Sequence, residues 1–166
     1  MTQTQKIISA VLKKADIKSG MRVYIKDPHT AISDDPFCGA YGRLYLKEKV
    51  FTVPEGVFIN LDGALRNNAE SCEIAQYIHS FLKKEKLCGL SVEFGGDSMG
   101  YLTMDDRIEV VKTLENTDVS PFCVIFECDY ITAEYTLGTL KEKTVAFYND
   151  GPQNFKKIIT VDLSKV

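Results

Sequence analysis

The sequence has 166 residues and is 45% hydrophobic, 26% charged and 10% aromatic, a composition that excludes disordered, fibrous and disulfide-scaffold chains. Its 20 basic and 23 acidic residues give a formal net charge of −3, which argues against a charge-driven attachment to nucleic acid or to an anionic membrane. We therefore expect a single globular domain over residues 1–166, with no membrane attachment and little affinity for nucleic acid.

The apolar segments are too short for a signal peptide or a membrane span. Residues 1–15 mix polar and apolar side chains at helical spacing, and a run of about 18 apolar residues occurs nowhere. The number of cysteines is odd and they contain no C-x-x-C pair, which is typical of reduced thiols. The sequence thus predicts a cytoplasmic protein without disulfide bonds.

In chain order, the first predicted element is a helix close to the N-terminus. Thr2 and Gln5 are spaced as a capping box, and the apolar residues that follow recur at helical spacing. Apolar and polar residues then alternate over 21–26, which predicts a strand. Residues 27–39 form a polar loop longer than most connections in compact domains, so this loop is a candidate place for a functional site.

Three short strands are predicted next, over residues 43–46, 50–53 and 57–61. The breaks between them are short, so we expect neighbouring antiparallel strands in a meander. A second helix is predicted from the apolar stripe around residues 74–82, with Asn67 and Glu70 as candidate caps.

The middle of the chain alternates strands and helices. Residues 90–94 are predicted to form a strand and residues 95–100 a glycine-rich turn. A third helix is expected to start at a capping box formed by Thr103 and Asp106. The continuous apolar run 122–126 predicts a strand at the centre of the sheet.

The last part of the chain is less clearly patterned. Residues 131–140 fit either a strand or a helix, and segments 144–148 and 157–163 are predicted to pair as a hairpin. The fold class expected from all these elements is α+β. We predict a mixed, largely antiparallel sheet and three main helices, with a βαβαβ unit over residues 57–129.

Three aspartates follow the three strands of that predicted unit, namely Asp62, Asp97 and Asp129. If the strands are parallel, these carboxylates could converge at one edge of the sheet and hold Mg²⁺ for phosphoryl chemistry. Aspartate is also common where a strand gives way to a turn, because its side chain binds nearby backbone N–H groups. The turn interpretation is favoured over the metal site.

The glycine-rich turn contains Gly95, Gly96, Asp97 and Ser98, and residues 96–100 match the G-x-S-x-G pattern of serine hydrolases. Both histidines of the chain, His29 and His79, precede this serine, whereas the pattern requires a histidine after it. A P-loop also fails, because no Lys-Ser or Lys-Thr pair follows Gly100. An anion-binding nest formed by the backbone of Gly95 and Gly96 remains open.

His29 lies in the long polar loop together with Asp34 and Asp35, a combination that could bind a metal ion or transfer protons. The spacing fits no known set of metal ligands, and a solvated loop histidine is the more common case. The chain is also rich in tyrosine, a residue type enriched at protein interfaces.

No catalytic motif is complete, so the sequence favours a cytoplasmic, non-enzymatic binding or regulatory protein that acts through protein–protein contacts. Its partner would be another protein or a second copy of itself, and it would need no cofactor. The alternative is a small metal-dependent enzyme that acts on a phosphate-containing substrate with Mg²⁺ bound by Asp62, Asp97 and Asp129.

Overall fold

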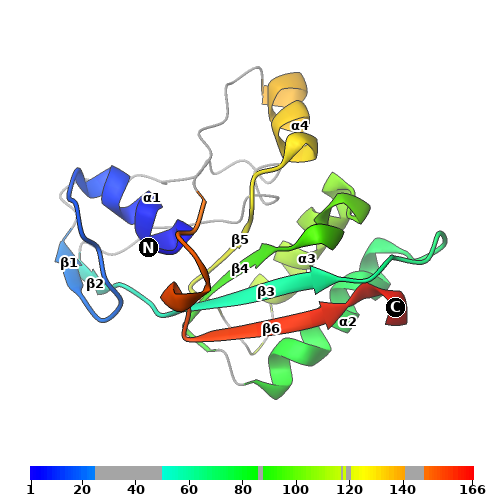
Figure 1. Ribbon diagram of the computed structural model, residues 1–166, viewed down its shortest axis with the longest axis horizontal. Coiled ribbons are helices and arrows are strands. Elements are labelled where there is room, and N and C mark those ends of the chain that lie inside the picture. Colours follow the sequence, from blue (N-terminus) through cyan, green and yellow to red (C-terminus); the bar gives the residue numbers. More distant parts are fainter. Residues whose placement is uncertain (25–49, 86–87, 117, 119–120, 141–147) are drawn as a thin grey trace.

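The computed structural model describes residues 1–24, 50–85, 88–116, 118, 121–140 and 148–166 (Figure 1). Within these ranges the α-helices are α1 (Gln3–Leu12), α2 (Ser71–Lys84), α3 (Met104–Glu115) and α4 (Tyr130–Leu140). The strands are β1 (Arg22–Tyr24), β2 (Val50–Thr52), β3 (Gly56–Asp62), β4 (Ser91–Gly95), β5 (Cys123–Phe126) and β6 (Lys157–Asp162). Short 3₁₀ helices are η2 (Asp97–Tyr101), η3 (Pro152–Asn154) and η4 (Leu163–Lys165).

The main sheet has four parallel strands in the order β5-β4-β3-β6, and a separate antiparallel pair is formed by β1 and β2. Helix α2 joins β3 to β4 and helix α3 joins β4 to β5, which is the alternation expected for residues 57–129. The α+β class is confirmed. The prediction of a largely antiparallel sheet is wrong for the described strands, because each connection contains a helix that returns the chain to the same end of the sheet.

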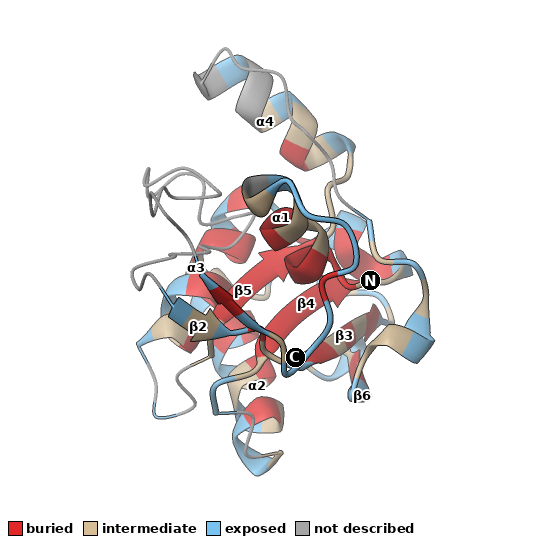
Figure 2. Cartoon of the chain, turned by 90° about the vertical axis from the view of Figure 1, so that its left-hand side faces the viewer, coloured by how far each residue is buried: buried red, intermediate tan, exposed pale blue. Residues whose placement is uncertain are grey.

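One face of the main sheet carries the larger hydrophobic core, against which α2 and α3 pack. Alternate residues of β3 point into it, and the apolar stripe of α2 covers them. The rings of Phe94 on β4 and Phe126 on β5 stack with their centroids 4.5 Å apart. Figure 2 shows the resulting burial of β4 and β5 along their whole length.

The other face of β4 and β5 is covered by α1. The capping box of Thr2 and Gln5 is confirmed, and Thr2 accepts a hydrogen bond from the Gln5 amide. Two further amides of the first turn, those of Gln3 and Thr4, donate to the carboxylate of Glu93 at 2.9 and 2.8 Å. The Thr4 hydroxyl donates to the same carboxylate at 2.7 Å. A fully buried acidic side chain on β4 therefore holds the start of α1 on the sheet.

Several expected elements are corrected by the structure. Strand β5 lies at an edge of the described sheet and not at its centre. Its apolar run is nevertheless buried, because α1 and α3 cover its two faces. Strands β2 and β3 belong to different sheets and do not form a meander. Segment 131–140 is helical, within α4, so the described ranges contain four α-helices in place of three. Helix α2 is capped by Glu70 and not by Asn67, whereas the predicted capping box of Thr103 and Asp106 at the start of α3 is confirmed.

The predicted C-terminal hairpin is only partly covered, since residues 144–147 lie outside the described residues, as does the predicted strand 43–46. Its second strand, β6, pairs in parallel with β3. Among the described residues, every helix is too short or too polar to cross a lipid bilayer.

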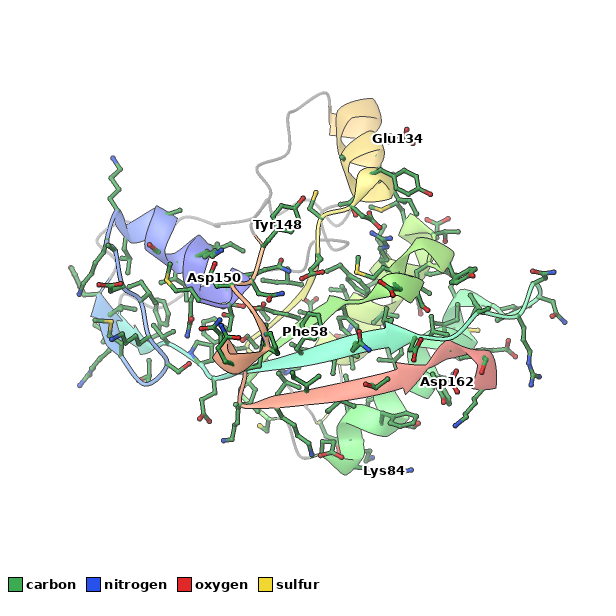
Figure 3. All side chains as sticks on the ribbon, in the orientation of Figure 1. Phe58, Lys84, Glu134, Tyr148, Asp150 and Asp162 are labelled. Atoms are coloured by element: carbon green, nitrogen blue, oxygen red, sulfur yellow. The ribbon has the colours of Figure 1, made fainter. Side chains whose placement is uncertain are left out.

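Replacement of Glu93 by alanine should lower the free energy of unfolding by about 2–4 kcal/mol, because two amides and a hydroxyl of α1 lose a buried acceptor. The measurement is urea-induced unfolding followed by circular dichroism. Glu134→Ala is the matched control, since this carboxylate is exposed on α4 (Figure 3), and its unfolding midpoint should not change. Equal midpoints for the two variants would contradict the anchoring role of Glu93.

Candidate functional site at the carboxyl edge of the sheet

Strands β3, β4, β5 and β6 run in the same direction, so their carboxyl ends lie at one edge of the sheet (Figure 1). In open parallel sheets, ligands bind beyond this edge. The segments there are the end of β3, the glycine-rich turn after β4 and the junction between β5 and α4. We call this region the carboxyl edge.

The turn after β4 is glycine-rich because side chains do not fit in it. A Cβ atom on Gly95 would lie 2.5 Å from Oε2 of Glu127 and 2.6 Å from the ring of Phe58. Gly96 has a φ of +104°, and its Cβ would lie 2.6 Å from the backbone oxygen of Leu61. The two glycines let the end of β4 pass closely between its neighbours.

Ser98 stabilises the same turn. Its hydroxyl donates a hydrogen bond of 2.6 Å to the backbone oxygen of Gly63, and the side chain is buried. The hydroxyl of Ser98 is thus bound to a carbonyl group and not to a side chain that could act as a general base. The serine of the G-x-S-x-G pattern here links η2 to the end of β3. Asp97, between Gly96 and Ser98, is exposed.

The three strand-end aspartates do not form a metal site within the described part of the chain, where groups of three or more potential ligands are absent. Asp62 accepts a hydrogen bond from the amide of Gly63, as the turn interpretation expects. Asp129 accepts one from the amide of Thr132 in the first turn of α4 and is also bound by Arg107. Local donors therefore occupy two of the carboxylates expected to bind Mg²⁺.

Arg107 is the central side chain of this edge, and the sequence analysis missed it. It is completely buried and donates to both oxygens of Asp129, at 2.8 and 2.6 Å. It also donates to the Thr132 hydroxyl and to the backbone oxygen of Met99 in η2. Burial opposes ionisation of Asp129, but the hydrogen bonds and charge of Arg107 outweigh it and lower the pKa of this carboxyl. Arg107 thereby ties η2, α3 and the β5–α4 junction together.

Glu127 is a second residue that the sequence analysis missed. One oxygen accepts a hydrogen bond of 2.6 Å from the side chain of Asn149. Burial, and then the charge of Glu93, raise the pKa of Glu127 above its usual value. A sequence signal existed, namely an acidic residue placed directly after the apolar run 122–126. A half-buried carboxyl of this kind can hold and release a proton nearer to neutral pH.

The other candidates lie elsewhere. His29, Asp34 and Asp35 are outside the described residues, and His79 lies on α2, part-buried. Tyrosines 101, 130 and 148 are 53–68% exposed, and the Tyr148 hydroxyl donates to the backbone of Cys128 at the end of β5 (Figure 3). These tyrosines belong to segments that flank the carboxyl edge rather than to an exposed face of the sheet.

The chain matches no protein-family model. It is similar to the 3-isopropylmalate dehydratase large subunit of Helicobacter hepaticus, with 27% identity over 116 residues, which are 70% of this chain and 27% of that protein. The protein of the same name from Clostridium kluyveri is 28% identical over 72% of this chain and 28% of its own length. Aconitate hydratase A of Rickettsia felis is 29% identical over 55% of this chain and 10% of its own. The chain thus spans about a quarter of the dehydratase large subunits.

These relatives overturn both functions inferred from the sequence. Their names are those of a dehydratase and a hydratase, which contradicts a non-enzymatic binding or regulatory protein and also a Mg²⁺-dependent enzyme acting on phosphate compounds. They also imply an iron–sulfur cluster, in place of no cofactor or Mg²⁺. The sequence analysis missed this relationship because it relied on complete motifs.

The described cysteines do not fit such a cluster by themselves. Clusters are held by several cysteine thiolates around one centre. Cys72 and Cys88 are exposed near opposite ends of α2, whereas Cys123 and Cys128 lie at opposite ends of β5. Burial raises the pKa of Cys123 and keeps it a thiol. Cys38 is outside the described residues, so we assign no cluster ligand.

The need for glycine at position 96 can be tested by stability. Gly96→Ala should cost about 2–4 kcal/mol, because the new side chain meets the backbone of β3 and the positive φ is strained. Gly100→Ala in the same turn is the control, since its Cβ would meet no atom within 4 Å and its cost should stay below about 1 kcal/mol. Thermal unfolding of both variants compares them directly, and similar costs would refute the steric argument.

The ion pair of Arg107 and Asp129 predicts a pH-dependent effect. Asp129→Asn should destabilise the protein by about 3 kcal/mol at pH 7, because a buried guanidinium loses its counter-charge. The pKa of Asp129 is lowered by folding, so its contribution is present above the unfolded value of about 4 and disappears on acidification. Urea unfolding at several pH values should show the two proteins converging below pH about 4. A constant difference would contradict an electrostatic origin.

Proposed function

We propose that this chain is one domain of a hydratase or dehydratase that acts on small hydroxycarboxylic acids. The observation that carries the proposal is the similarity to the dehydratase large subunits over 70% and 72% of the chain. The two aconitate hydratases add support from enzymes whose substrate name is also a small carboxylic acid.

The geometry of the carboxyl edge is compatible with this activity. Adding or removing water requires a group that takes up and releases a proton. Glu127 is our candidate, since it is half-buried, its pKa is raised, and Asn149 fixes one of its oxygens. Arg107 is buried and both oxygens of the part-buried Asp129 accept hydrogen bonds from it, so the role of this pair is to hold the segments of the carboxyl edge together.

The chain spans only about a quarter of the dehydratase large subunits, so we expect the complete reaction to need further polypeptide. The described residues provide the carboxyl edge and, in Glu127, a carboxyl group that can carry a proton. An iron–sulfur cluster of the kind that the relatives imply would have to be bound with ligands beyond those described here.

To test the proposal, the tagged chain is purified under anaerobic conditions from its source organism, together with the proteins that bind it. Hydration of aconitate and dehydration of 3-isopropylmalate are then followed by the ultraviolet absorption of the carbon–carbon double bond. Glu127→Gln should lower kcat at least about tenfold and remove one limb of the pH–rate profile, because the amide cannot carry a proton.

Glu134→Gln is the matched control, because this exposed carboxylate lies on α4, and its kcat should equal that of the unmodified chain. Absence of both reactions from the purified material would refute the proposed function. Full activity of Glu127→Gln would refute the role of this residue.

A further inference from the structure

Strand β6 forms one edge of the main sheet (Figure 1). Among the described strands, β3 is its one neighbour. After β6 the chain turns back toward β3, where the amide of Ser164 lies beside Gly63, so η4 does not cover the outer side of β6. An edge strand presents backbone N–H and C=O groups that can pair with another strand. The outer side of β6 is therefore a candidate interaction surface.

One face of the sheet is also incompletely covered beside this edge. On that face, α1 covers β4 and β5, and the ring of Phe155 packs on Phe58 of β3. On β6, Ile158 and Thr160 point to the same face and are exposed, Ile158 by 45%. The opposite edge strand, β5, is buried along its whole length. The uncovered apolar surface of the sheet therefore lies at β6.

The charges of β6 suit an antiparallel copy of the same strand. Lys156 and Lys157 stand at its start and Asp162 at its end, whereas residues 158–161 are uncharged. Charged residues within an edge strand commonly prevent its pairing with other strands, and the middle of β6 has none. An antiparallel copy would place the basic end of each strand beside the acidic end of the other.

Symmetry and charge select one register for such a pair. Two identical strands related by a two-fold axis pair in antiparallel, with one residue directly opposite its own copy. If that residue is Ile159, near the middle of β6, Lys156 lies opposite Asp162 of the second copy. On the exposed face, Ile158 then lies opposite Thr160 of the second copy. A pair centred on Thr160 would instead place Asp162 opposite the apolar Ile158.

The charged side chains at the two ends are available for this pairing. Lys156 Nζ lies 2.5 Å from Glu55, and Lys165 Nζ lies 3.6 Å from Asp162. The side chains of all four residues are at least 38% exposed. Exposed ion pairs contribute little to stability, so an exchange of partners between Lys156 and Asp162 of two copies costs little.

We propose that two copies of this chain associate through their β6 strands, which pair in antiparallel around Ile159 and join the two main sheets into one sheet of eight strands. The pairing satisfies outer backbone groups of β6 and covers Ile158. The two pairs of Lys156 with Asp162 fix the register. The inference goes beyond the proposed function and does not rest on it, because it uses neither Glu127 nor any other residue of the carboxyl edge proposed to carry a proton.

Charge reversal tests this interface. Sedimentation equilibrium of the full chain should show a dimer with a Kd of about 10 μM that weakens as salt is added, since a single short edge buries less area than most stable interfaces. Lys156→Glu and Asp162→Lys should each raise this Kd at least about tenfold, because like charges then meet at both ends of the pair. An equimolar mixture of the two variants should associate as tightly as the unmodified chain, because opposite charges then meet at both ends.

Lys84→Glu is the matched control, because it makes the same change of charge at an exposed position on α2 (Figure 3), and its Kd should equal that of the unmodified chain. Circular dichroism checks that each variant keeps its fold. A monomer at about 100 μM would overturn the proposal and leave the edge to another occupant, such as further polypeptide. Equal dimerisation of Lys156→Glu and Lys84→Glu, or no association in the mixture of the two edge variants, would overturn it as well.

The outcome is independent of the proposed function. Hydratase or dehydratase activity in material that contains one copy of the chain would overturn the dimer and leave the function standing. A dimer that responds to charge reversal as expected, in material without either activity, would support the β6 interface and refute the function.

Discussion

The close approach of β4 to its neighbours at Gly95 and Gly96 is the constraint on which the carboxyl edge depends. Because neither residue has a side chain, the backbone can turn directly into η2 against the end of β3. Ser98 then binds the backbone of Gly63 and fixes the start of η2. Arg107 binds the far part of η2 through the carbonyl of Met99, so the turn is held from both sides.

The two faces of β4 have different neighbours and different chemistry. On one face, apolar side chains such as Phe94 contribute to the core with α2 and α3. On the other, the Glu93 carboxylate receives the first amides of α1, where the partial positive charge of the helix favours an anion. Burial nevertheless raises the pKa of Glu93, so the desolvation of its charge exceeds the effect of these hydrogen bonds. This contact fixes α1 at a definite place on the sheet, although burial destabilises the charged form of the Glu93 carboxylate.

Local features of the fold could be predicted from the sequence, whereas long-range ones could not. The capping boxes at Thr2 and Thr103 depend on residues three positions apart, and the structure confirms both. Strand direction depends on which strands meet in space, so short turns suggested antiparallel neighbours where β3 pairs with β4 and β6 in parallel. The pair of Arg107 with Asp129 spans 22 positions, and periodicity gives no sign of it.

The same difference explains the outcome for function. Asp62 and Asp129 are visible at strand ends in the sequence, but only the structure shows that nearby backbone amides donate to their carboxylates, as is typical of aspartates in turns and helix starts. At the end of β5, Arg107 donates to the carboxylate of Asp129, and Asn149 donates to the carboxylate of Glu127. Both donors lie 22 positions away in the sequence, so periodicity gives no sign of these pairs. A parallel sheet therefore brings Glu127 and the pair of Arg107 and Asp129 to one edge without a shared sequence motif.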